Sequence, residues 1–201
     1  MRHHLLFVLL AVSCLCRSLS TVDAASYTFT TLDVPNAIRT EAYGINDGGQ
    51  IVGNYQDASA GIHGFLYTAG IFTSLDVPVP GALATWAQGI NTRGQIVGIY
   101  GLGFGGVDLH GFFYSDGIFT RLDAPGASQT FANGINNRGQ VVVVNIDPGL
   151  LQGFLYANGV YTPLEFPRDS HPSGINNKGQ IVGTYGDQHG THGFVATPQK
   201  K

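Results

Sequence analysis

The motif of this chain is Gly89-Ile90-Asn91-Thr92-Arg93-Gly94-Gln95-Ile96-Val97-Gly98, and it recurs along the sequence. Its Gly-Ile-Asn start is found again at residues 44, 134 and 174, so that the spacings between copies are 45, 45 and 40 residues. Self-similarity with a period of about 20–50 residues is the signature of repeat architectures. We therefore interpret the chain as four copies of one structural unit.

Each copy reads as four short strands. The first strand ends at Gly-Ile-Asn, and the second begins at the Gln that follows three turn residues, the last of which is always Gly. A three-residue hairpin loop ends in a left-handed residue, which Gly adopts without a Cβ clash. The third and fourth strands are joined by two residues, which in the first three copies are Ala69-Gly70, Asp116-Gly117 and Asn158-Gly159. Such pairs favour a type I′ turn, in which both residues have positive φ.

A two-residue turn also fixes which residues face each other across the hairpin. Pairing Thr68 with Ile71 places His63 opposite Asp76. The same rule places His110 opposite Asp123 and Gln152 opposite Glu165. A carboxylate that orients an imidazole is half of a Ser-His-Asp triad. Because the pair recurs from copy to copy, we interpret it as a strand-to-strand hydrogen bond and assign no catalytic residue.

The order of the strands is offset along the chain. Residues Tyr27 to Asp33 read as a strand of the fourth type, whereas the last copy ends with its third strand, His192 to Ala196. In closed propellers such an offset strand completes the last blade and protects its edge; His192 would then face Asp33. We therefore expect an all-β, β-propeller-like fold of four repeats, each a four-stranded antiparallel blade, with the N-terminal strand closing the last blade.

The start of the sequence reads as a signal peptide, residues 1–24. An apolar run from Leu5 to Cys16 follows a short positive start and is too short to span a bilayer, and small residues at Val22 and Ala24 fit a cut after Ala24. Residues 25–201 then form a single four-repeat β-propeller domain without cysteine, secreted or periplasmic. The alternative is a lipid anchor at Cys14, because Ala11-Val12-Ser13-Cys14 loosely resembles a lipobox.

Composition and motifs exclude several classes of function. Charged residues make up 11% of the 201 residues, the formal net charge is −3, and Lys and Arg are scattered, so we expect no nucleic-acid partner and no membrane span. The sequence has no Gly-x-Ser-x-Gly elbow, EF-hand loop or His-Glu-x-x-His motif, and we expect neither metal nor cofactor. Loop aspartates usually cap turns. We therefore interpret four loop aspartates as turn caps: Asp57, Asp147, Asp187 and Asp108.

The two repeated markers together resemble a known family. Gly-Ile-Asn-x-x-Gly-Gln-Ile-Val-Gly followed by His-Gly-Phe-x-Tyr is similar to the extracellular HAF repeat family of bacteria, over about residues 27–196 in four copies. This sequence has Gly where the family name has Ala, and Gln152 replaces the His in the third copy. The resemblance implies export and a propeller-like repeat, and it implies no reaction.

Positions at which the four copies disagree are the candidate ligand-binding residues, because packing demands are shared between repeats and ligand demands are not. Two such positions lie three residues and one residue before the Gly of each Gly-Ile-Asn. The first position holds Glu41, Trp86, Phe131 and His171, and the second holds Tyr43, Gln88, Asn133 and Ser173. Residues spaced by two share one face of a strand. Aromatic, amide and hydroxyl groups predict a carbohydrate or peptide ligand.

Two functions from different classes follow from these observations. The first is an exported scaffold that serves as a binding or interaction module. The alternative is a propeller-type glycan lyase, hydrolase or lactonase acting at the central face, which would gather titratable residues such as Glu41, His171, Asp169 and Arg39 around one pocket. We expect a monomer, with a dimer of two chains in one eight-bladed ring as the alternative.

Overall fold

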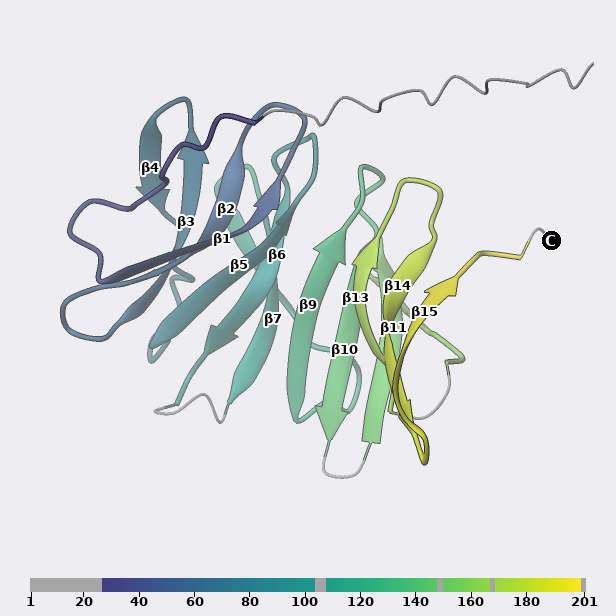
Figure 1. The fold of residues 1–201 in the computed structure, drawn as a ribbon. Coiled ribbons are helices and arrows are strands. Elements are labelled where there is room, and N and C mark those ends of the chain that lie inside the picture. The colour runs from purple at the N-terminus through teal and green to yellow at the C-terminus, as the bar shows by residue number, and fades with distance from the viewer. Residues whose placement is uncertain (1–26, 104–107, 148–149, 167–168, 200–201) are drawn as a thin grey trace, which may run out of the picture. The chain divides into compact units, whose positions relative to one another are not determined.

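The repeated hairpins account for every strand of the computed structural model, which describes residues 27–103, 108–147, 150–166 and 169–199 (Figure 1). Fifteen strands and no helix are assigned in these residues, which confirms the all-β class. The predicted signal peptide lies outside the described residues. By its internal contacts the chain divides into two parts, residues 1–31 and 32–201, and all fifteen strands belong to the second part. None of the described residues belongs to a helix able to cross a membrane.

The strands fall into four repeat units that follow one another along the chain. The first unit comprises β1 (Arg39–Ile45), β2 (Ile51–Gln56), β3 (Ile62–Thr68) and β4 (Ile71–Ser74). The second comprises β5 (Ala84–Ile90), β6 (Ile96–Gly101), β7 (Leu109–Ser115) and β8 (Ile118–Leu122). The third comprises β9 (Gln129–Ile135), β10 (Val141–Asp147), β11 (Leu150–Ala157) and β12 (Val160–Pro163). The fourth comprises β13 (His171–Ile175), β14 (Ile181–Asp187) and β15 (Gly190–Ala196).

Within each unit, consecutive strands pair antiparallel, as the sequence predicted for three four-stranded units. A single parallel bridge between Ile62 and Ala84 joins the first two units into one eight-stranded sheet. The fourth unit differs from the prediction. It has three strands, β15 pairs with β14 alone, and residues 27–34 form no strand, so the structure does not contain the expected fourth strand of this unit.

The turns within the units have the predicted backbone geometry. The glycines that end the three-residue turns have φ between 72° and 80°; they are Gly49, Gly94, Gly139 and Gly179. In the two-residue turns the first residue has φ of 49° to 53° and the second has φ of 83° to 91°, which confirms positive φ at both positions. The resulting register pairs Thr68 with Ile71, Ser115 with Ile118, and Ala157 with Val160.

The first strand of every unit carries a β-bulge, which the sequence did not predict. In β5, Ala87 pairs with Gly98 and Gly89 pairs with Val97, so that Gln88 is left without a partner residue on β6. The same extra residue interrupts the other three first strands, at Tyr43, Asn133 and Ser173. A bulge bends a strand and increases its twist. The bulge therefore lies at the second of the two variable positions.

The core is built between successive units. Val52 of the first unit lies in one buried cluster with Ala87 and Ile90 of the second unit. Val97 of the second unit lies in a corresponding cluster with Ala132 of the third. Fully burying such a side chain stabilises a protein by about 1.5–3 kcal/mol. The first and second units therefore depend on the following unit for the burial of their second strands.

Candidate functional site: an asparagine-lined cavity

The asparagine of each Gly-Ile-Asn motif closes its own turn. Asn91 Oδ1 accepts hydrogen bonds from the backbone N–H groups of Arg93 and Gln95, both at 3.0 Å. Its Nδ2 donates to Gln95 Oε1 at 2.7 Å. Asn91 is almost fully buried, and this local network satisfies its amide. The same contacts recur at the corresponding asparagines Asn46, Asn136 and Asn176.

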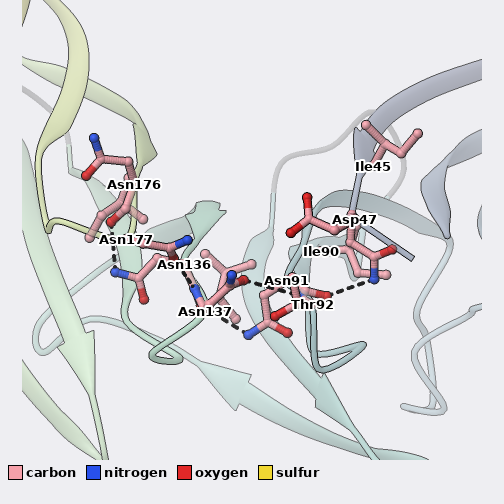
Figure 2. A pocket seen from close by; sticks show the side chains of 12 residues that line it. Ile45, Asp47, Ile90, Asn91, Thr92, Asn136, Asn137, Asn176 and Asn177 are labelled. Carbon is pink, nitrogen blue, oxygen red and sulfur yellow. Dashed lines mark hydrogen bonds between the residues drawn. The ribbon is translucent and has the colours of Figure 1, made fainter. Parts of the chain in front are cut away.

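The asparagines also connect the units in a ladder (Figure 2). Asn46 Nδ2 donates to the backbone oxygen of Asn91 at 2.9 Å. Asn91 Nδ2 donates to the oxygen of Asn136, and Asn136 Nδ2 donates to the oxygen of Asn176, both at 3.1 Å. One side chain therefore closes a turn and fixes the position of the next turn.

A cavity of about 200 Å³ lies along this ladder. Each of the four units contributes three consecutive residues to its lining: the isoleucine, the asparagine and the residue after it. The isoleucines and asparagines are the same in every unit. The third residue varies between units, and these residues are Asp47, Thr92, Asn137 and Asn177. The cavity thus combines a repeated frame with four polar groups of three kinds.

Two of these polar groups are held by the ladder and two are not. The backbone N–H of Thr92 donates to Asn137 Oδ1 at 3.1 Å, and the N–H of Asn137 donates to Asn177 Oδ1 at 2.8 Å. Within the described part of the chain, the Asp47 carboxylate and the Thr92 hydroxyl have no hydrogen-bond partner. The cavity therefore offers a carboxylate acceptor and a hydroxyl that can donate and accept.

The eight residues predicted from the sequence lie on the first strands of the four units. The first set, from Glu41 to His171, lies on β1, β5, β9 and β13, and the second set contains the bulged residues. None of the eight lines the asparagine cavity. The sequence analysis missed the cavity residues because it assigned Gly-Ile-Asn to the turn alone. The signal in the sequence was the place of these residues directly after the asparagine of each copy, at positions 47, 92, 137 and 177.

Several of the eight residues make specific contacts. Tyr43 Oη donates to the Glu41 carboxylate at 2.9 Å, which places both side chains on one side of β1. Glu41 also pairs with Arg39. The hydrogen bond from Tyr43, with smaller contributions from Asn54 and Arg39, lowers the pKa of Glu41. In the third unit, Asn133 Nδ2 donates to the backbone oxygen of Pro172 at 3.0 Å.

The titratable residues that an enzyme would gather do not share one set of contacts. Arg39 and Glu41 pair with each other on β1. Among the described residues, no hydrogen bond or ion pair joins either of them to His171 or Asp169. Two of the four residues named for the enzyme alternative, Arg39 and Glu41, are therefore in contact, and both lie on β1.

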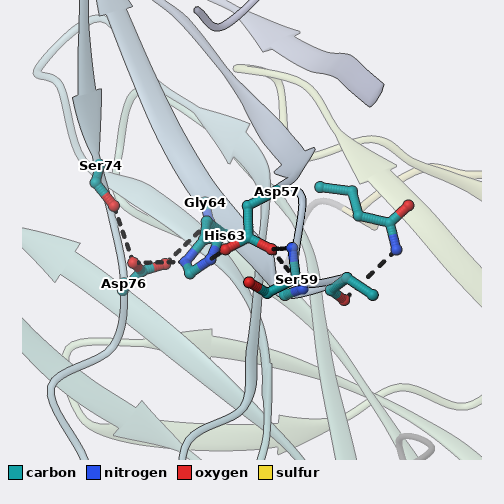
Figure 3. Close-up of polar contacts among 9 residues, drawn as sticks. Asp57, Ser59, His63, Gly64, Ser74 and Asp76 are labelled. Atoms are coloured by element: carbon teal, nitrogen blue, oxygen red, sulfur yellow. Dashed lines mark hydrogen bonds and ion pairs between the residues drawn. The ribbon is translucent and has the colours of Figure 1, made fainter. Parts of the chain in front are cut away.

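The predicted His–Asp pairs are confirmed at His63 and His110, and each of these two histidines has a second carboxylate that the sequence did not predict (Figure 3). His63 Nδ1 lies 3.0 Å from Asp76 Oδ2, and its Nε2 lies 3.3 Å from Asp57 Oδ2. His110 lies 3.1 Å from Asp123 and 3.0 Å from Asp108 in the same way. The structure gives Asp187, at 3.1 Å, as the carboxylate partner of His192, in place of the predicted Asp33.

Two of the loop aspartates, Asp57 and Asp187, cap their own turns as expected, whereas Asp147 binds a residue of a distant segment. Asp57 Oδ1 accepts the backbone N–H groups of Ser59 and Gly61, both at 2.8 Å, and these bonds lower the pKa of Asp57 (Figure 3). Asp147 accepts two hydrogen bonds from Ser128, and Asp187 accepts the N–H of His189. Across the described residues, no group of three or more His, Cys, Asp and Glu side chains is placed to hold a metal ion.

Comparisons with known proteins give weak likenesses to solved structures. No family model matches the chain, and no curated protein matches it. A solved candidate gluconolactonase aligns with a TM-score of 0.45 and 16% identity, over 77% of this chain and 62% of that one. A triple arginine-to-alanine mutant of AofleA from Arthrobotrys oligospora aligns with a TM-score of 0.39 and 11% identity, over 84% of this chain and 60% of that one. This chain therefore spans about three fifths of the length of either structure, and at these TM-scores the likenesses assign it no activity.

Proposed function

We propose that this chain is an exported repeat scaffold that works as a binding module, and that the asparagine-lined cavity takes a small neutral carbohydrate. The observation that carries the proposal is that the position after each asparagine holds an aspartate, a threonine and two asparagines, on a frame that is otherwise repeated. A structural role would be served by the same residue in each unit. Asp47, Thr92, Asn137 and Asn177 instead offer a mixture of acceptors and donors.

The chemistry of the lining favours a polyol. Sugar hydroxyl groups donate and accept hydrogen bonds, and the carboxylate, hydroxyl and amide groups of the cavity can do the same. The isoleucines of the four units provide apolar surface for the C–H face of a sugar ring. Asp47 is the only charged residue of the lining, so an anionic ligand would meet a like charge. The volume of about 200 Å³ suits one sugar residue.

Export and ring closure are part of the same proposal. The apolar start of the sequence and the resemblance to the extracellular HAF repeat support export. The four Gly-Ile-Asn copies support a propeller-like ring in which each copy supplies one blade. The eight residues on the first strands, from Glu41 to Ser173, extend the proposed surface beyond the cavity, and a peptide is the alternative ligand for that extension.

The test is calorimetric titration with glucose, galactose, mannose and N-acetylglucosamine, and with a set of tripeptides. We expect saturable binding of at least one sugar, weakened at least fivefold by Asp47→Asn and by Thr92→Val. Neither side chain bonds to another described residue, so both variants should keep the fold. Asp116→Asn is the matched control, because Asp116 lies in a two-residue turn away from the cavity lining. No sugar binding, or equal affinity in all variants, would exclude the cavity as the site.

A second measurement separates the cavity from the predicted first-strand surface. Trp86 is the only tryptophan, and it lies on β5 outside the cavity lining. A ligand confined to the cavity should leave Trp86 emission and the affinity of Trp86→Phe unchanged. A change in emission together with a loss of affinity in Trp86→Phe would place the ligand on the first-strand surface.

A further inference from the structure

The interface between successive units is built in the same way three times. A Cβ built on Gly44 would lie 3.2 Å from the backbone oxygen of Gln88, so glycine lets the first strand of one unit approach that of the next. The hydrogen bonds of the asparagine ladder join the same successive units. Beside the ladder, at the first two of these interfaces, the valine of the second strand packs into a cluster with the alanine of the following unit, as Val52 does with Ala87 and Val97 does with Ala132.

The last unit presents one half of this interface without a partner. Val52, Val97 and Val142 have no exposed surface, whereas their counterpart Val182 on β14 is 45% exposed. Asn176 closes its own turn, but within the described chain its Nδ2 donates to no further unit. We call this surface the tail face, defined by Gly174, Asn176 and Val182.

The first unit presents the other half. Ile90 is buried with 8% of its surface exposed, whereas its counterpart Ile45 on β1 is 68% exposed. Ala87 and Ala132 are fully buried, whereas their counterpart Ala42 is exposed. No asparagine of another described unit donates to the backbone oxygen of Asn46. We call this surface the head face, defined by Ala42, Ile45 and Asn46.

We propose that the head face of one chain binds the tail face of a second copy, and that both ends of each chain are joined in this way to form a two-chain ring. The two faces are complementary because they repeat a pairing that the chain already makes internally: Val52 and Ile90 share one cluster, and Val182 would meet Ile45. A head-to-tail interface is heterologous and must close to avoid filaments. Propellers close with about four to eight blades, and two copies supply eight units, whereas three would exceed that range.

Sedimentation equilibrium of the chain is the direct test. We expect the mass of two chains for the wild type, and the mass of one chain for Ile45→Lys and for Val182→Glu, since each places a charge in both interfaces of the ring. The matched controls are Ile71→Lys and Ile118→Glu, which change residues of equal exposure, 68% and 67%, on strands outside both faces. These controls should remain dimeric. A monomeric wild type, or dimeric Ile45→Lys and Val182→Glu, would overturn the proposal.

Mixing the two variants tests the head-to-tail direction. A mixture of Ile45→Lys and Val182→Glu contains one wild-type interface per ring, and the other interface brings Lys beside Glu. We therefore expect the mixture to recover the mass of two chains, although neither variant forms a dimer alone. Recovery also shows that each variant is folded. A mixture that remains monomeric, while far-UV circular dichroism shows both variants to be folded, would refute head-to-tail pairing.

Discussion

Asn145 on β10 lies directly opposite Gln152 on β11. The other three units pair a tyrosine with a histidine at this point, and in the first unit the rings of Tyr55 and His63 stack with centroids 5.1 Å apart. Both members of the pair are therefore replaced together in the third unit. Asn145 is 3% exposed, and its Oδ1 is buried without a hydrogen-bond partner. An unpaired buried acceptor costs free energy, about 1–3 kcal/mol.

Restoring the pair should show coupling between the two positions. We expect the double variant Asn145→Tyr with Gln152→His to be more stable than the sum of its single variants by about 1 kcal/mol, because the stacked contact forms only when both rings are present. Urea denaturation of the four proteins gives the coupling free energy. Additive effects would show that the third unit has lost the geometry that the other three share.

The His63 contacts predict a dependence of stability on pH. Burial acts to lower the pKa of His63, but the hydrogen bonds and charges of Asp76 and Asp57 outweigh it, so its pKa is raised in the folded state. The stabilisation is therefore fully present below the unfolded pKa of about 6.5, and it is lost as the pH rises through the folded pKa.

We expect the wild type to gain about 0.5 kcal/mol over His63→Gln between pH 8 and pH 6, the size of a partly exposed ion pair. Chemical denaturation at both pH values measures this gain. His189→Gln serves as the control, because the His189 ring contacts Gln188 and no carboxylate within the described chain. Parallel pH profiles of wild type and His63→Gln would contradict the prediction.

The asparagine ladder can be measured by comparing two of its members. Asn91→Ala and Asn176→Ala remove the same turn contacts, but only Asn91 donates onward to another unit. We expect Asn91→Ala to lower the free energy of unfolding by about 1–2 kcal/mol more than Asn176→Ala, since it also leaves the buried oxygen of Asn136 without its donor. Thermal and urea denaturation test this difference. Equal losses in the free energy of unfolding would show that the turns are independent and that the bonds between units add no stability.

The two-residue turns offer a reciprocal pair of variants. Ala69 has φ of 49°, although alanine disfavours this region, and Asn158 occupies the same position of the third unit with φ of 51°. We expect Ala69→Asn to raise the free energy of unfolding by about 0.5–1 kcal/mol and Asn158→Ala to lower it by a similar amount. Denaturation midpoints of both variants provide the measurement, and changes of the same sign would argue against a common turn geometry.

Local chemistry explains which parts of the fold could be predicted. Glycine at the third turn position and the Asp-Gly and Asn-Gly pairs set the turns, and the turns set the register that joins His63 to Asp76. The bulge was not predictable in this way, because an extra residue is visible only when two strands are counted against each other. Residues 27–33 alternate like a strand, yet alternation alone does not supply a pairing partner.

The asparagine-lined cavity was missed for a related reason. Asn91 has a sufficient local role in its turn, so its neighbours in the sequence do not indicate the bond that it makes to Asn136, 45 residues away. The second carboxylates, such as Asp57 beside His63, were not predicted because their loop position matched a capping role, which Asp57 also fulfils. When a residue makes both a local and a distant contact, the residues next to it in the sequence indicate only the local contact.

The bulge in the first strand of each unit has a consequence for how such a chain can change over time. Tyr43, Gln88, Asn133 and Ser173 occupy equivalent places, and none of them has a partner residue on the adjoining second strand. A new side chain there leaves every paired residue of the sheet in place. These four positions can therefore be substituted without disturbing the strand pairing on which the fold depends. A new binding specificity could be acquired in this way, one residue at a time.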